Sequence, residues 1–168
     1  EVRGESAKVA IADVKKDASL RSSFEAIEAR RVGGRLTVAA ESANVLAEDI
    51  GGPSDVRTSF GDVVLRRVAG PITVAGESAG VAIEDVKCPP ASCLIDVRTT
   101  FRPIEVTLPA GAGVRGTARA TFGRVLTDLP VTLMQSRELE TQVVSFGEGE
   151  GGITLQLKTN GDITVRKK

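Results

Sequence analysis

The sequence repeats itself at a fixed interval of 18 residues, and this interval restricts the possible folds more than any other feature. Residues 20–50 and 56–86 align at an offset of two intervals, and 16 of the 31 aligned residues are identical. Residues 4–7 match residues 76–79 at twice that offset. A repeat of this fidelity predicts a chain built from stacked copies of one structural unit.

Aliphatic residues recur at the same positions of each copy, and most of them are β-branched, which favours strands over helices. Within a copy they alternate with other residues, as in Val9-x-Ile11, and Gly or Pro follows, as in residues 51–53. This pattern predicts short strands joined by turns. The columns spaced by 18 are Val9, Ile27, Val45, Val63 and Val81; Val14, Val32, Ile50, Val68 and Val86; Val2, Leu20, Val38, Val56 and Val74; and Ile11, Ala29, Ala47, Leu65 and Ile83.

Eighteen residues are too few for a helix-turn-helix repeat or a propeller blade, which need about 34 and about 40 residues. The interval fits one coil of a single-stranded parallel β-helix, a solenoid in which each strand lies about 4.8 Å from its equivalent in the next coil. We therefore predict an all-β fold with about 18 residues per coil. Right-handed winding is favoured, although the pattern does not determine the hand.

All 168 residues belong to one domain in this prediction. Regular coils occupy residues 1–86, an insertion occupies 87–94, and less regular coils in 95–168 cap the open end of the stack. Ile104-x-x-x-Leu108-Pro109 recurs as Val125-x-x-x-Leu129-Pro130. We therefore expect these two segments to lie in successive coils.

One column alternates between large and small residues. It reads Ser6, Phe24, Ser42, Phe60 and Ser78. Each Phe thus has room above and below it, and we predict that the Phe side chains point into the core.

Two adjacent positions reverse their charge from each coil to the next. In a parallel stack, opposite charges on neighbouring strands attract, and a slip by one coil would place Arg against Arg. We interpret these residues as a structural charge ladder that fixes the order of the coils. The alternative, a charged binding strip, is less favoured because the charges cancel locally. The charge ladder consists of Asp13, Arg30, Arg31, Glu48, Asp49, Arg66, Arg67, Glu84 and Asp85.

A further column carries Arg at several coils: Arg3, Arg21, Ala39, Arg57 and Ala75. The simpler interpretation is a solvated edge. The alternative is a row of cations that binds an anionic polymer.

The period breaks once, since the equivalent of Val81 is Ile104, and the five extra residues fall within 87–94. Both cysteines, Cys88 and Cys93, lie in this insertion. Their spacing is not that of a zinc or thioredoxin site. Either a small disulfide closes the loop or two free thiols lie at a turn, and the favoured disulfide indicates an extracytoplasmic compartment, the periplasm or the cell surface.

Composition excludes several classes of function. The chain has no His, Trp or Tyr, and Lys+Arg and Asp+Glu both total 22. Catalysis by His, His metal ligands and a basic nucleic-acid footprint are therefore excluded. No segment is apolar for long enough to insert into a membrane, and no nucleophile elbow, phosphate-binding loop or dinucleotide fingerprint is present. We therefore expect no catalytic residue, no metal and no cofactor.

Residues 57–64 (Arg-Thr-Ser-Phe-Gly-Asp-Val-Val) and 157–165 (Leu-Lys-Thr-Asn-Gly-Asp-Ile-Thr-Val) resemble segments of the bacterial putative adhesin family, β-helical domains of unknown function. The resemblance covers nearly the whole chain. It implies a single-stranded β-helix in an exported or envelope-associated protein, and it transfers no catalytic residue. The chain departs from the family pattern after Phe24 and Phe101, where the Gly that follows Phe is missing.

These observations together predict a non-enzymatic, adhesion-like binding module of the bacterial cell envelope, whose partner is a protein or a surface polymer. A self-assembling scaffold that associates end to end or through strand edges is one alternative to a monomer. A polysaccharide lyase or hydrolase on a β-helix is another. Because residue 1 is Glu and Val2 is already in register, we expect the natural protein to begin upstream.

Overall fold

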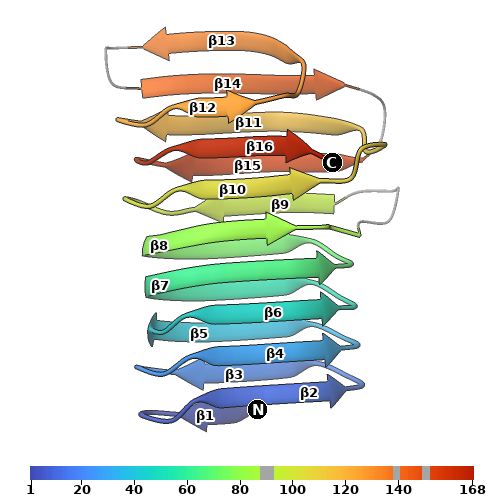
Figure 1. Ribbon diagram of the computed structural model, residues 1–168, viewed down its shortest axis with the longest axis vertical. Helices are drawn as coiled ribbons and strands as arrows, with labels where there is room; N and C mark the ends of the chain where they lie inside the picture. Colours follow the sequence, from blue (N-terminus) through green and yellow to red (C-terminus); the bar gives the residue numbers. More distant parts are fainter. Residues whose placement is uncertain (88–92, 138–140, 149–151) are drawn as a thin grey trace.

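The computed structural model describes residues 1–87, 93–137, 141–148 and 152–168, and within these ranges the chain forms β-strands and no helix. It therefore contains no helix that could span a membrane in the described part. Most strand pairs are parallel (Figure 1). The strands are β1 (Val2–Gly4), β2 (Val9–Val14), β3 (Ala18–Ser22), β4 (Ile27–Val32), β5 (Leu36–Ser42), β6 (Val45–Ile50), β7 (Ser54–Val68), β8 (Ile72–Glu84), β9 (Cys93–Arg98), β10 (Ile104–Leu108), β11 (Val114–Thr121), β12 (Val125–Thr127), β13 (Val131–Arg137), β14 (Thr141–Glu148), β15 (Ile153–Thr159) and β16 (Ile163–Lys167).

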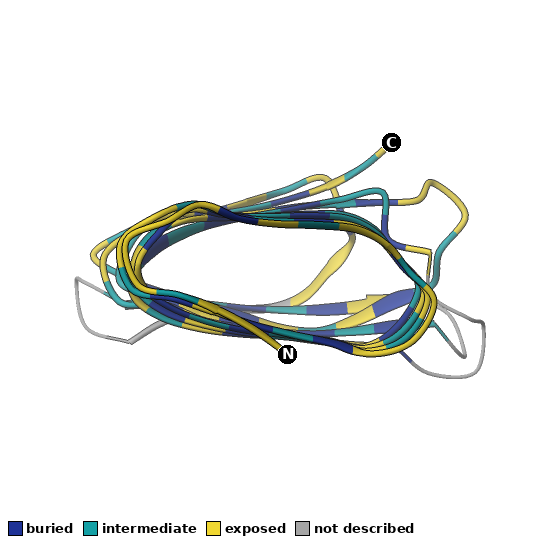
Figure 2. Cartoon of the chain, turned by 90° about the horizontal axis from the view of Figure 1, so that it is seen from below, coloured by how far each residue is buried: buried dark blue, intermediate teal, exposed yellow. Residues whose placement is uncertain are grey.

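The strands lie in two rows that face each other across a narrow core. One row contains β1, β3 and β5, the other contains β2, β4 and β6, and the long strands β7 and β8 bend at a corner and contribute to both. Figure 2, which looks along the stack, shows the chain running round a flattened outline. One circuit of this outline is called a level below.

Residues 18 apart are direct partners on neighbouring strands. Val45 pairs with Ile27 on one side and with Val63 on the other. All three are almost fully buried, with exposed fractions of 1% or less. Each such side chain contributes about 1.5–3 kcal/mol through removal of apolar surface from water. The 18-residue pattern predicted from the sequence is thus the register of the parallel pairing in this part of the chain.

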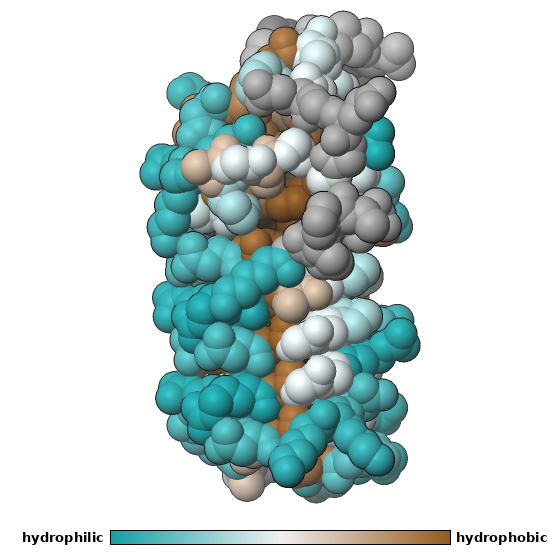
Figure 3. All heavy atoms as spheres, turned by 90° about the vertical axis from the view of Figure 1, so that its right-hand side faces the viewer, coloured by the Kyte–Doolittle hydropathy of each residue, from teal (hydrophilic) through white to brown (hydrophobic). Residues whose placement is uncertain are grey.

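After β2, β4 and β6 the chain turns a corner from one row of strands to the other, and the backbone has the same conformation there at each level. Asp13, Arg31, Asp49, Arg67 and Asp85 have positive φ angles between 53° and 58°. This left-handed conformation favours Gly, Asn and Asp over other residues. Asp therefore suits this corner, whereas Arg31 and Arg67 adopt a conformation that their side chains disfavour, and each of them pairs with the Asp of a neighbouring level. Figure 3 shows this side of the molecule, where an apolar column runs along the stack beside hydrophilic side chains.

The register also accounts for the break in the repeat. Ile104 pairs with Val81, 23 residues earlier, and the strands before it continue the stack because Val97 pairs with Val74. Residues 88–92, which form most of the predicted insertion, lie outside the described residues.

The prediction that Val125 lies one coil beyond Ile104 is wrong. The C-terminal strands β15 and β16 lie between the two segments: Ile163 pairs with Ile104 on one side and with Val125 on the other. Strand β15 is likewise inserted between β9 and β11. The end of the stack is therefore formed by β13 and β14, which pair in antiparallel fashion and join it through β11 (Figure 1).

The prediction that the Phe side chains point inward is also wrong. Phe24 and Phe60 are 64% and 54% exposed. The core position at this corner is occupied by small hydroxyl residues instead: Ser22 and Thr58 are buried, and the Thr58 hydroxyl donates a hydrogen bond to the Phe60 carbonyl oxygen at 2.8 Å. The chain turns between Thr58 and Phe60, so the in-and-out alternation of the strand is interrupted and the ring faces solvent.

Candidate functional site

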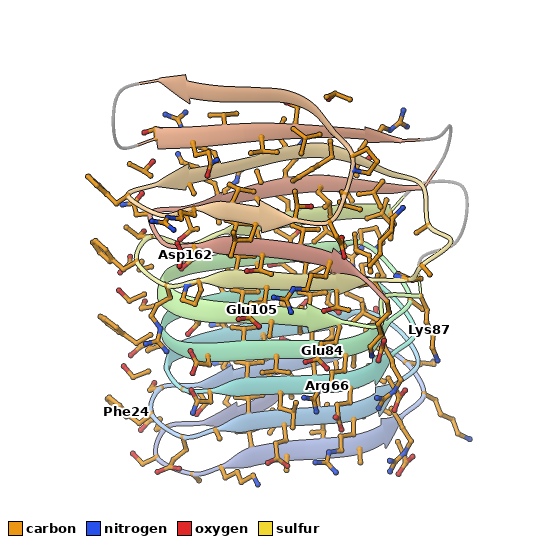
Figure 4. The ribbon with its side chains drawn as sticks, turned by 45° about the horizontal axis from the view of Figure 1, so that its top comes forward. Phe24, Arg66, Glu84, Lys87, Glu105 and Asp162 are labelled. Atoms are coloured by element: carbon orange, nitrogen blue, oxygen red, sulfur yellow. The ribbon has the colours of Figure 1, made fainter. Side chains whose placement is uncertain are left out.

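The charge ladder predicted from the sequence lies on neighbouring strands. The Arg66 guanidinium is 3.0 Å from the Glu84 carboxylate and 3.5 Å from that of Glu48. Figure 4 shows Arg66 and Glu84 one above the other on β7 and β8. Arg30 is 3.5 Å from Glu48. Glu48 thus lies between two guanidinium groups, as the alternation in the sequence requires.

In the second column of the charge ladder, each Arg forms an ion pair with the Asp of the preceding level. Arg67 donates two hydrogen bonds to Asp49, of 2.6 and 2.9 Å, and Arg31 contacts both carboxylate oxygens of Asp13. These hydrogen bonds hold the pKa values of Asp49 and Asp13 below their ordinary value. Asp85 is 3.0 Å from the ammonium group of Lys168. Every member of the charge ladder therefore contacts a group of opposite charge.

A groove of about 750 Å³ runs along the stack on the opposite row of strands, over β1, β3, β5, β7, β8 and β9. Its lining repeats from level to level in three columns: a cation or Ala, then a small residue, then Glu, Ser or Thr. The lining residues are Arg3, Gly4, Glu5, Arg21, Ser22, Ser23, Ala39, Ala40, Glu41, Arg57, Thr58, Ser59, Ala75, Gly76, Glu77, Arg98, Thr99, Thr100 and Lys158.

One column of this lining, called the basic column below, contains Arg3, Arg21, Ala39, Arg57 and Ala75. It extends beyond the five coils identified in the sequence. The register continues it from Ala75 to Arg98, then to Lys158 and then to Arg119. Arg57 and Arg98 approach carboxylates of their own strands, at 3.5 Å from Asp55 and 2.9 Å from Asp96.

Three cations of this column have no such partner. Within the part of the chain that the structure describes, Arg21, Lys158 and Arg119 form no ion pair. The charges of Arg21 and Lys158 are therefore available to a ligand in the groove, and that of Arg119 to a ligand that extends beyond the groove over β11.

Exposed Phe residues lie at the corner beside this groove at alternate levels, although none of them is part of its lining. Phe24, Phe60, Phe101 and Phe122 each follow an Arg of the basic column by three residues, namely Arg21, Arg57, Arg98 and Arg119. Phe101 and Phe122 are 71% and 68% exposed. The same Arg-x-x-Phe segment therefore occurs four times on one edge, once at every second level. Figure 4 shows Phe24 projecting from this corner away from the stack.

The intervening levels have a different composition. Glu5, Glu41 and Glu77 line the groove there, and each is followed by Ser at the position of the Phe. Levels with Arg and Phe thus alternate with levels that carry Glu and Ser from Arg21 to Arg98, whereas Arg3 shares a level with Glu5 and Lys158 occupies the level between Arg98 and Arg119.

The described residues contain no group of three His, Cys, Asp or Glu side chains that could hold a metal ion. None of the described cysteines is a free thiol. Cys93 begins β9 and is buried, whereas Cys88 lies outside the described residues, so the Cys88–Cys93 disulfide stays a prediction.

Comparison of the chain with protein-family models, with curated proteins and with solved structures found no match in any of the three. The functional argument therefore depends on the geometry of the groove and on the charges that line it.

The 18-residue period of the sequence connects only two of the four Arg-x-x-Phe segments, those that begin at Arg21 and Arg57. The insertion shifts Arg98 and Phe101 out of the 18-residue period, and the C-terminal strand β15 separates them from Arg119 and Phe122. A search for Arg-x-x-Phe without a fixed period would have found all four.

Proposed function

We propose that this chain is a non-enzymatic binding module, built on a single-stranded parallel β-helix of about 18 residues per coil, and that it binds a linear anionic polymer along the groove. The single domain comprises residues 1–168 in this proposal. The parallel register between residues 18 apart supports the β-helix, and the flattened outline in Figure 2 agrees with it.

The basic column is the observation that carries the proposed function. Its cations occupy six of eight successive strands along one line, with Ala on the other two. The charges of Arg21, Lys158 and Arg119 are not neutralised by other described residues. A ligand whose negative charges are distributed along its length can contact all of these cations at once. A small anion would contact only one or two of them.

The resemblance to the bacterial adhesin family and the two cysteines support a location outside the cytoplasm, at the cell envelope. A binding module at that location would hold a surface polymer.

The test compares removal of groove cations with removal of the same number of cations elsewhere. The test variant is Arg21→Ala/Lys158→Ala, which removes the two lining cations that form no ion pair with other described residues and leaves the Ala that this column itself has at Ala39 and Ala75. The control is Lys15→Ala/Lys16→Ala, which removes two exposed charges outside the groove. Binding to polyphosphate, polyglutamate and polygalacturonate is measured by titration calorimetry at low salt.

The proposal predicts that the natural chain binds at least one of these polymers, that the groove variant binds it at least tenfold more weakly, and that the lysine variant binds as the natural chain does. Because screened charges attract less, binding should weaken as salt is added. Absence of binding to all three polymers, or equal losses in both variants, would refute the proposed function.

A further inference from the structure

We propose that the polymer is an acidic polysaccharide, whose sugar rings pack against the four exposed phenylalanines while its acidic groups bind the Arg residues of the same levels. This inference rests on the proposed function and specifies the class of ligand.

The Phe residues form a regular array. Phe60 pairs with Ser42 on one side and with Ser78 on the other, so that the nearest Phe lies two levels away in each direction. Two levels correspond to about 9.6 Å, and the four rings therefore span about 29 Å along the stack. An array with a constant step matches a ligand that has its own constant repeat and lies parallel to the stack.

The rings are separated from one another by small residues, and this separation distinguishes the array from an apolar docking patch. Ser42 and Ser78 occupy two of the intervening levels. A protein or membrane contact favours apolar surface that is continuous over several hundred Å². Isolated rings beside charges instead suit a ligand that presents alternating apolar faces and polar edges, as a chain of sugars does.

The corner that carries the rings is held in place before any ligand binds. The Ser22 hydroxyl donates to the Glu25 carbonyl oxygen, just after Phe24, at 2.8 Å. Arg102, next to Phe101, donates to the Asp62 carboxylate at 2.8 Å, across the level of Gly80. Binding therefore requires little ordering of the protein, which favours affinity.

The charges in the groove favour a polysaccharide over a nucleic acid. The cations of the column lie one level (about 4.8 Å, as from Arg98 to Lys158) or two levels (about 9.6 Å, as from Arg21 to Arg57) apart, and both steps are wider than the distance of about 3.4 Å between phosphates along one strand of a duplex. Glu41 and Glu77 lie between Arg21, Arg57 and Arg98, and the phosphodiester groups of a nucleic acid offer their carboxylates no hydrogen-bond donor. Their carboxylates can accept hydrogen bonds from sugar hydroxyls.

An extended peptide is a poorer match because most strands under the groove pair on both sides, and the open edge of β1 lies only at the end of the groove. Strand β5 pairs with β3 and β7, and β8 pairs with β7 and β9. Their backbone groups are therefore already engaged, and a peptide could not bind along the groove by adding a strand to the sheet.

The test replaces two rings with the residue found at the intervening levels. The variant Phe60→Ser/Phe101→Ser removes exposed side chains only, so the fold should persist, and thermal unfolding checks that it does. The control is Leu126→Ser on β12, which removes an apolar side chain that is 53% exposed. Binding is measured by calorimetry to polygalacturonate, to polyphosphate as a polyanion without sugar rings, and to oligothymidylate.

The inference predicts that the Phe variant binds polygalacturonate about tenfold more weakly, binds polyphosphate within a factor of about two of the natural chain, and unfolds at an unchanged temperature. The Leu126 variant should bind as the natural chain does. Unchanged polygalacturonate binding in the Phe variant would overturn the inference and leave the proposed function intact.

Two further outcomes would also overturn it. Equal losses for polygalacturonate and polyphosphate would show that the rings maintain the groove rather than contact sugars. Tightest binding to oligothymidylate, with loss on removal of the rings, would assign the groove to single-stranded nucleic acid. If no polyanion binds the natural chain, the proposed function itself fails, and the inference fails with it.

Discussion

Reversal of one charge in the middle of the charge ladder should destabilise the chain twice as much as the same reversal at its end. Arg66 lies between Glu48 and Glu84, whereas Arg30 faces Glu48 on one side and Ala12 on the other. The variant Arg66→Glu therefore loses two attractive contacts and creates two repulsive ones. The variant Arg30→Glu loses one contact and creates one.

The expected magnitudes follow from these contacts. A partly exposed ion pair contributes about 0.2–1 kcal/mol, and like charges on facing strands cost a similar amount. Arg66→Glu should therefore lower the free energy of unfolding by about 1–3 kcal/mol and Arg30→Glu by about half as much. With a urea dependence of about 2 kcal/mol per molar, the Arg66 variant should unfold at a midpoint about 0.5–1.5 M lower.

Urea unfolding at low salt measures these effects, and two further conditions identify their cause. The double variant Arg66→Glu/Glu84→Arg restores one of the two attractive contacts, so it should match Arg30→Glu. In 1 M NaCl, where charges are screened beyond about 3 Å, the differences should largely disappear. Equal losses in the two single variants, no recovery in the double variant, or losses that persist in high salt would refute the charge ladder.

Three other perturbations have defined outcomes. Arg67 lowers the pKa of Asp49 in the folded chain below its ordinary value of 3.8, so the ion pair between them stabilises the fold above that pH. This stabilisation is lost as the pH falls below 3.8, and urea midpoints measured from about pH 5 to about pH 2.5 test the loss. Leu65→Ala, at a fully buried position, should cost about 2–5 kcal/mol in urea unfolding, whereas Leu126→Ala should cost under about 0.5. Deletion of residues 152–168 should abolish hydrogen-exchange protection in β12, which pairs with β16, and lower it in β11, which keeps its pairing with β14, but should leave β3–β7 protected. Unchanged protection in β12 would contradict the inserted position of β16.

The regular half of the fold can be predicted from the sequence because spatial neighbours there are a constant distance apart along the chain. Val45 contacts Ile27 and Val63, and all three belong to one column of identical character. Every apolar column repeats the same spacing, so the register is specified several times over.

The C-terminal arrangement could not be predicted in this way. Ile104 and Val125 begin similar segments, and their spacing resembles one coil, yet both pair with Ile163. Which strand fills the space between them depends on long-range packing, and all three segments have the same alternating apolar pattern. Local periodicity cannot distinguish insertion of the C-terminal strands from simple succession.

The candidate site was predicted only in part. The basic column was visible as an alternative to a solvated edge, but the Phe rings were assigned to the core because an alternation of Phe with Ser suggests room inside a stack. The rings point outward because of the contacts at the corner. The buried Thr58 hydroxyl donates a hydrogen bond to the Phe60 carbonyl oxygen, and the chain turns between these two residues. A side chain's direction at a bend depends on such contacts and not on the period of the strand.

Cross-linking between engineered cysteines tests the stacking of successive levels most directly. Leu46 and Val64 are partners 18 residues apart, and Glu28 lies one level further along the same column. With Cys88→Ser and Cys93→Ala as background, Leu46→Cys/Val64→Cys should form a disulfide under mild oxidation, since the spacing of about 4.8 Å suits one. Glu28→Cys/Val64→Cys, about 9.6 Å apart, should not form one. Cross-linking of the second pair, or failure of the first, would contradict the stacked register on which the account depends.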